Sequence, residues 1–156
     1  MMSKSAWGIG IIGVLIFVSD LIIQSRISRT MIPGQSIPVV SPLLSLTYVL
    51  NNGAAFSLLR GGTPLFILVA LALLIGIAIY TVRHPHMPRV MVVALGLLAG
   101  GSAGNLWDRI IWGRVVDYIH IIDWPVFNLA DSAIVVGMAL LVYHYWRQEK
   151  NGQFSS

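Results

Sequence analysis

The chain has 156 residues, of which 56% are hydrophobic and only 10% are charged, and its formal net charge is +4. Soluble domains carry about a quarter charged residues, so a soluble core of this length could not bury so much apolar surface. The absence of cysteine excludes disulfides, thiol nucleophiles and thiolate metal ligands. The pI near 9.9 reflects the small number of charges rather than a nucleic-acid-binding surface. The composition therefore predicts an integral membrane protein.

Four apolar runs approach the roughly 17 to 25 residues that a helix needs to cross a bilayer, and they are residues 7–24, 64–82, 90–106 and 129–146. We therefore expect a single all-α integral membrane domain, residues 1–156, with four transmembrane helices. Lys4 precedes the first run, as in a cleavable signal peptide. Because the run ends in Asp20-Leu-Ile-Ile-Gln24, without a small-residue cleavage site, we expect a permanent anchor.

An even number of spans places both termini on one side of the membrane. The basic residues divide five against five between the two sides, so the positive-inside rule does not choose an orientation. The acidic residues are less evenly distributed. Five of the six fall on the side opposite the termini, and they are Asp20, Asp108, Asp117, Asp123 and Asp131.

The segment between the first two spans, residues 25–62, is longer than a plain connection, and long loops tend to be functional. Its prolines and the rough alternation over residues 45–50 predict a small extracytoplasmic β element between the first and second helices. We expect this element to lie on the membrane surface. It could also cover a bound peptide as a lid.

Small residues line the third span, where Gly96, Gly100 and Gly104 recur every four residues. Such a stripe predicts a groove for close helix packing. Packing alone explains it, and its functional value is indirect. It would let the helix end that carries Asn105 and Asp108 lie against its neighbours.

Ionisable groups near hydrocarbon are costly and are functional-site candidates by default. Asp131 has a simpler explanation, because Asn128-Leu-Ala-Asp131 matches a helix capping box. Asp108 and Arg109 could likewise be an ion pair or a hydrogen-bonding brace. Asp117 lies in an apolar stretch where no cap is needed, and its obvious partner is Asp131. Two close carboxyl groups share one proton and can supply both the acid and the base that activate water against a peptide carbonyl.

Five motifs in order carry a family resemblance over nearly the whole chain. They are Asp20 in the first span, Asn51-Asn-Gly-Ala-Ala-Phe56, Gly104-Asn105-x-x-Asp108-Arg109, Gly113-x-Val-x-Asp117-Tyr118 and Phe127-Asn128-x-Ala-Asp131. With this hydropathy, the chain resembles the lipoprotein signal peptidases, the type II signal peptidases of bacteria.

The resemblance implies an aspartyl endopeptidase of the bacterial inner membrane, with both termini cytoplasmic and the active site near the outer face. It would cut the signal peptide from diacylglyceryl-modified prolipoproteins just before the lipidated cysteine, among membrane lipids, and be inhibited by cyclic peptides such as globomycin. No cofactor, metal ion or nucleic acid is implied. The catalytic pair would be Asp117 and Asp131. The substrate-binding or supporting residues would be Asp20, Asn51, Gly53, Asn105, Asp108, Arg109 and Asn128.

One position departs from the family pattern, which is Asp-x-x-x-Lys in the first span. Here the lysine position is Gln24, one helical turn after Asp20. The ion pair is therefore in doubt. The amide could still donate a hydrogen bond to Asp20, and Arg26 or Arg109 could supply the missing charge.

Two other functions need weighing. A small four-span transporter or proton-coupled carrier would also hold intramembrane carboxylates, but it should distribute them through the membrane depth and show an inverted repeat. A zinc protease would need a His-Glu-x-x-His pattern. The four histidines are instead scattered over both sides, at His84, His86, His120 and His144.

Overall fold

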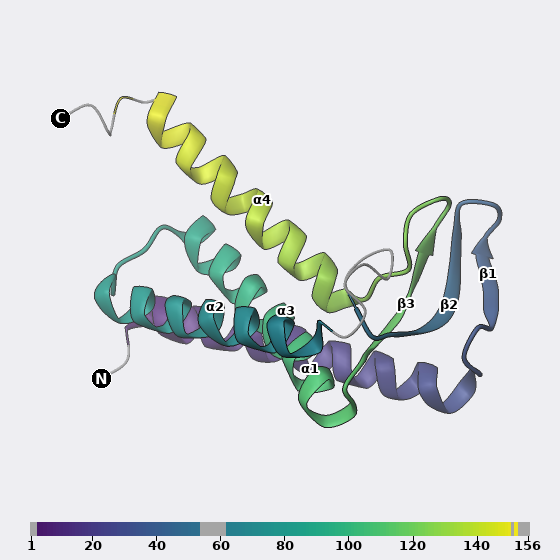
Figure 1. Cartoon of the computed structure of the whole chain (residues 1–156). Coiled ribbons are helices and arrows are strands. Elements are labelled where there is room, and N and C mark those ends of the chain that lie inside the picture. Colours follow the sequence, from purple (N-terminus) through teal and green to yellow (C-terminus); the bar gives the residue numbers. More distant parts are fainter. Residues whose placement is uncertain (1–2, 54–61, 151, 153–156) are drawn as a thin grey trace.

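The structure, a computed structural model, describes residues 3–53, 62–150 and 152. Its four long helices are α1 (Lys4–Thr30), α2 (Thr63–Arg83), α3 (Arg89–Trp112) and α4 (Leu129–Lys150). Each is long and apolar enough to cross a membrane. The start of α1 and the end of α4 lie at the same end of the bundle (Figure 1). The predicted four-helix membrane fold is confirmed.

The helices extend beyond the apolar runs, most clearly in α1, which continues from Gln24 to Thr30. Ile27 in this extension is buried and packs with Tyr48 and Tyr118 of the sheet. Ser28 and Thr30 donate hydrogen bonds to carbonyls one turn back. Hydropathy therefore marks the hydrocarbon-crossing part of the helix, whereas packing against the sheet prolongs it.

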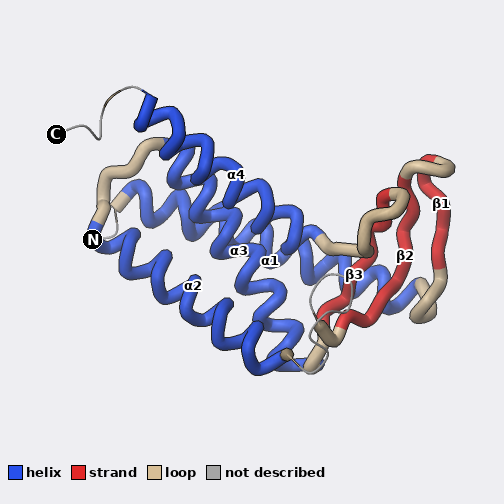
Figure 2. The backbone as a smooth tube through the Cα atoms, turned by 45° about the horizontal axis from the view of Figure 1, so that its top comes forward, coloured by secondary structure: helices blue, strands red, loops and turns tan. Residues whose placement is uncertain are grey.

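A small antiparallel sheet lies where α1 ends and α4 begins (Figures 1 and 2). The predicted β element between the first two helices is present as two strands, β1 (Ser36–Val40) and β2 (Leu44–Asn51). A third strand that we did not predict, β3 (Val115–Ile121), comes from between α3 and α4 and completes the order β1-β2-β3. Asn51 of β2 pairs with Val115, and Val49 with Asp117. The sheet thereby brings the end of the first loop beside Asp117.

The small-residue stripe lets α3 pack closely against two helices. A Cβ atom on Gly100 would lie 2.5 Å from the carbonyl oxygen of Gly13 in α1. One on Gly101 would clash with the carbonyl oxygen of Ala130 in α4. The predicted groove is therefore present, and glycines on adjacent faces of α3 serve both neighbours.

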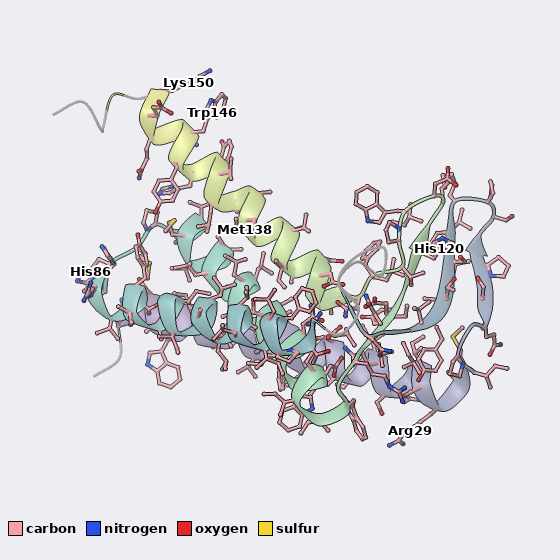
Figure 3. All side chains as sticks on the ribbon, in the orientation of Figure 1. Arg29, His86, His120, Met138, Trp146 and Lys150 are labelled. Carbon is pink, nitrogen blue, oxygen red and sulfur yellow. The ribbon has the colours of Figure 1, made fainter. Side chains whose placement is uncertain are left out.

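The outer surface of the bundle is apolar, as lipid contact requires. In α2 only Ile77 is buried, while Leu68, Ile75 and Val82 are exposed. Figure 3 shows Trp146 and Lys150 at the end of α4 far from the sheet, where an aromatic ring and a cation suit a membrane interface.

Candidate functional site

The two acids singled out by the sequence lie on different elements, Asp117 in β3 and Asp131 in the first turn of α4. The chain between them turns back on itself. Phe127 accepts a backbone hydrogen bond from Ile119 and donates one in return, at 2.7 and 3.0 Å. Both carboxyl groups consequently line one cavity of about 640 Å³.

Two amide side chains connect the carboxyl groups. Buried Asn128 donates from Nδ2 to Asp117 Oδ1 at 3.2 Å and to Asn105 Oδ1 at 3.1 Å. Asn105 in turn donates to Asp131 Oδ1 at 2.7 Å. The position and orientation of each carboxyl group therefore depend on the same pair of amides.

The predicted capping box is also present. The backbone amide of Asp131 donates to Asn128 Oδ1 at 2.8 Å, and that of Asn128 donates to Asp131 Oδ2 at 3.3 Å. Capping uses Oδ2 of Asp131, while Oδ1 accepts from Asn105 and the side chain lines the cavity. The capping role is thus real and does not exclude a chemical one.

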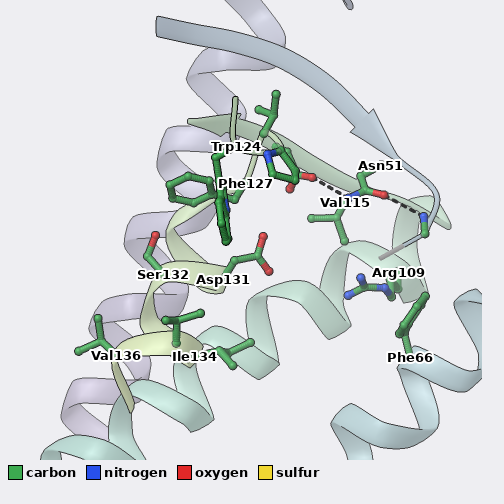
Figure 4. A pocket seen from close by; sticks show the side chains of 15 residues that line it. Asn51, Phe66, Arg109, Val115, Trp124, Phe127, Asp131, Ser132, Ile134 and Val136 are labelled. Carbon is green, nitrogen blue, oxygen red and sulfur yellow. Dashed lines mark hydrogen bonds between the residues drawn. The ribbon is translucent and has the colours of Figure 1, made fainter. Parts of the chain in front are cut away.

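Asn51 closes the site from the end of β2. Its Nδ2 donates to Asp117 Oδ2 at 2.8 Å, and its Oδ1 accepts from the backbone amide of Gly53 at 2.9 Å (Figure 4). Both residues line the cavity. The rest of this motif, residues 54–56, lies outside the described residues, as do residues 54–61 of the segment that we predicted to act as a lid.

Arg109 lines the cavity from α3, and its side chain extends toward the same space as that of Asp131 (Figure 4). One guanidinium nitrogen donates to the carbonyl of Asn105 at 3.2 Å, and the group lies 5.0 Å from the ring centroid of Phe66. Asp108 instead lines a second cavity together with Gln24. Successive helical residues diverge by about 100°, and no ion pair joins Asp108 to Arg109 in the part of the chain that the structure describes. Of the two alternatives expected, an ion pair or a hydrogen-bonding brace, Arg109 is a brace that donates to the helix backbone.

Asp20 lies outside the main cavity and is fully buried. Gln24 Nε2 donates to its Oδ2 at 2.7 Å, as predicted, and the Tyr118 hydroxyl donates to its Oδ1 at 3.1 Å. Neither arginine considered as a substitute for lysine has this role. Arg26 lines a groove along α1, and Arg109 lines the main cavity.

The environment of Asp117 favours its protonated form. Burial and, to a smaller extent, the nearby charge of Asp131 raise the pKa of Asp117 to about 7, although the Asn51 hydrogen bond and Arg109 oppose the shift. A group with this pKa is about half protonated at neutral pH. The site can therefore present one protonated carboxyl group.

The sequence analysis did not identify the apolar wall of the cavity. Its residues are Phe66, Val115, Trp124, Pro125, Val126, Phe127, Ile134, Val135 and Val136. They come from α2, from β3, from the turn after β3 and from α4. Only Val115 and Phe127 belong to quoted motifs, and the Trp124-Pro125 pair was the available signal for the others.

Comparison with known proteins places this chain in a family. The family described as "Signal peptidase (SPase) II" matches residues 12–147. A lipoprotein signal peptidase of Halothermothrix orenii is 40% identical over 91% of this chain and 97% of its own length. That of Bacillus subtilis is 40% identical over 83% and 87%. A solved bacterial membrane enzyme superimposes with a TM-score of 0.89 at 32% identity, covering 97% of this chain and 95% of its own.

The raised pKa of Asp117 predicts how stability depends on pH. Its carboxyl group titrates near 7 when folded and near 4 when unfolded, so between these values the folded state binds more protons. The free energy of unfolding should therefore fall as pH rises from about 4 to about 7. Unfolding in detergent at several pH values, for the parent and for Asp117→Asn, measures this. The exposed acid in Asp123→Asn is the control, and equal slopes for parent and Asp117→Asn would contradict the prediction.

The Gln24–Asp20 contact predicts a difference between two substitutions. Gln24→Lys should keep turnover and change stability by at most about 1 kcal/mol, because a lysine can still reach the carboxylate. Gln24→Leu should cost roughly 1 to 3 kcal/mol, since it leaves buried Asp20 without one of its donors. Thermal unfolding and turnover of the three proteins test this. If Gln24→Leu matches the parent in both, Asp20 does not depend on this residue.

Proposed function

Since this chain belongs to the signal peptidase II family, we propose that it is an aspartic endopeptidase that cleaves diacylglyceryl-modified prolipoproteins just before the lipidated cysteine. The observation that carries the proposal is the pair of carboxyl groups in one cavity, joined through Asn128 and Asn105. A carrier would not require this coupling of two acids at one end of the bundle.

In the proposed reaction, ionised Asp131 takes a proton from water as the water attacks the scissile carbonyl. Protonated Asp117 donates its proton to the carbonyl oxygen, and a tetrahedral intermediate forms. Its collapse breaks the C–N bond, and a proton from the pair passes to the leaving amine. The raised pKa of Asp117 supports this assignment of the acid.

The surrounding amides orient this pair more directly than they contact substrate. Asn51 and Asn128 donate to Asp117, and Asn105 donates to Asp131. Arg109 is the better candidate for binding a substrate carbonyl or the developing oxyanion, because it lines the cavity and its guanidinium group donates one hydrogen bond among the described residues, to a backbone carbonyl.

The substrate is held at the membrane by its lipid, and the apolar wall of the cavity suits its signal segment. The active site would face the outer side of the bacterial inner membrane, with both termini in the cytoplasm. β3 and the start of α4, which carry the pair, lie at the end of the bundle opposite the start of α1 (Figure 1), and this supports placing the site and the N-terminus on opposite sides of the membrane. Globomycin-type cyclic peptides would occupy the same cavity.

Asparagine substitutions in the carboxyl pair should abolish cleavage. Asp117→Asn and Asp131→Asn each keep the side-chain shape but remove a proton-transfer group, and the double variant should be little worse than either single one. The assay is cleavage of a diacylglyceryl-modified prolipoprotein by enzyme in detergent or lipid, with and without globomycin.

The matched control is Asp123→Asn, which makes the same exchange at an exposed turn residue and should retain activity. Near-normal turnover of Asp131→Asn would leave only the capping role for that residue. Failure of the parent to cleave under every lipid condition would contradict the proposed function.

A further inference from the structure

We propose that Tyr118 is a positioning residue for the carboxyl pair, whose hydroxyl group fixes the first turn of α4 against β3 and is itself held by Asp20. This inference rests on the proposed function. Tyr118 is absent from the cavity wall, so its effect on the reaction would act through Asp117 and Asp131.

The hydroxyl group of Tyr118 makes two hydrogen bonds in a buried setting. It accepts from the backbone amide of Leu129 at 3.0 Å and donates to Asp20 Oδ1 at 3.1 Å. Tyr118 is 3% exposed and Asp20 is 0% exposed. Tyr118 directly follows Asp117 in the chain, and Leu129 precedes Asp131 by two residues. One hydroxyl group thus connects the two short segments that carry the carboxyl pair.

The start of α4 needs these acceptors. The first amides of a helix have no partner within the helix, and the positive end of the helix dipole favours a nearby negative charge. The Leu129 amide donates to Tyr118, and the Ala130 amide faces the Asp20 carboxylate. Asp20 in α1 therefore faces the first turn of α4 and is joined to it through Tyr118.

Neutral donors hold Asp20 in this chain. Gln24 donates to Oδ2 and Tyr118 to Oδ1, while the acids Asp108 and Asp131 also face it. Burial and the charge of Asp20 raise the pKa of Tyr118, so its hydroxyl group keeps the proton that it donates. Because neither donor carries a charge, the Tyr118 hydroxyl group supplies one of the two side-chain hydrogen bonds that Asp20 accepts in the described part of the chain.

Loss of the hydroxyl group should loosen the first turn of α4 relative to β3. Asp131 would then lie less firmly beside Asp117, and the contribution of its charge to the raised pKa of Asp117 would fall. Tyr118→Phe should lower kcat by roughly 10- to 100-fold, the scale of a small misplacement of catalytic groups. KM should change little because the cavity wall is intact. The alkaline limb of the kcat/KM profile should move to lower pH.

Tyr48→Phe is the matched control, because Tyr48 is a buried tyrosine of β2 in the same apolar cluster. It should leave kcat and the alkaline limb unchanged. Asp20→Asn should reproduce the effects of Tyr118→Phe, and the double variant should be less than additive. The pH dependence of the free energy of unfolding is a readout that does not need cleavage. In this measurement the Asp117 transition, meaning the fall in the free energy of unfolding that ends near the folded-state pKa of Asp117, should end at a lower pH in Tyr118→Phe than in the parent.

Two results would overturn the inference. One is a Tyr118→Phe enzyme that matches Tyr48→Phe in kcat, alkaline limb and Asp117 transition. The other is a Tyr118→Phe protein whose free energy of unfolding is lower than that of the parent while kcat and both pH readouts are unchanged. The hydroxyl group would then stabilise the fold without positioning the carboxyl pair. If the parent does not cleave, the proposed function fails, while the unfolding comparison still decides whether Tyr118 positions Asp117.

Discussion

The first turn of α4 imposes the constraint on which the site depends. Its amides need hydrogen-bond acceptors at a place surrounded by apolar helices, and an unsatisfied buried amide is costly. Asn128 at the start of α4 and Tyr118 in β3 supply acceptors. Asp20 in α1 faces the same turn and accepts from the Tyr118 hydroxyl group. Satisfying this one helix end therefore fixes the relative positions of α1, β3 and α4. The carboxyl groups of Asp117 and Asp131 are placed as a consequence.

Close helix packing makes this arrangement possible. A Cβ atom on Gly104 would lie 3.1 Å from Asp20 Oδ2 and 3.4 Å from the Cβ of Ala130, so glycine leaves room for a carboxylate between α3 and α4. A buried polar cluster is stabilising only when its members are satisfied. The described residues meet this condition with one exception, since Asp108 Oδ2 has no hydrogen-bond partner among them. That atom lies away from the carboxyl pair, beside the second cavity.

The sequence predicted the parts of the fold that depend on local patterns. Hydropathy located all four helices, and alternation located β2. The strand β3 was not predicted, because its partner β2 is distant in sequence. The β-branched residues in the run Val115-Val-Asp-Tyr-Ile-His-Ile121 were nevertheless a usable signal. The link from Tyr118 to Asp20 and Leu129 could not be predicted, because it joins three elements whose approach depends on tertiary packing. The divergence of Asp108 and Arg109 into different cavities, by contrast, follows from helix geometry and could have been predicted.

The pH profile of kcat/KM for the parent enzyme, measured on a diacylglyceryl-modified prolipoprotein, tests the central claim most directly. Two coupled carboxyl groups that share one proton predict a bell-shaped profile belonging to the pair. Its alkaline limb should lie near the pKa of about 7 at which Asp117 loses its proton, and metal chelators should leave the profile unchanged. A profile without an alkaline limb, or activity that a chelator abolishes and zinc restores, would contradict the account.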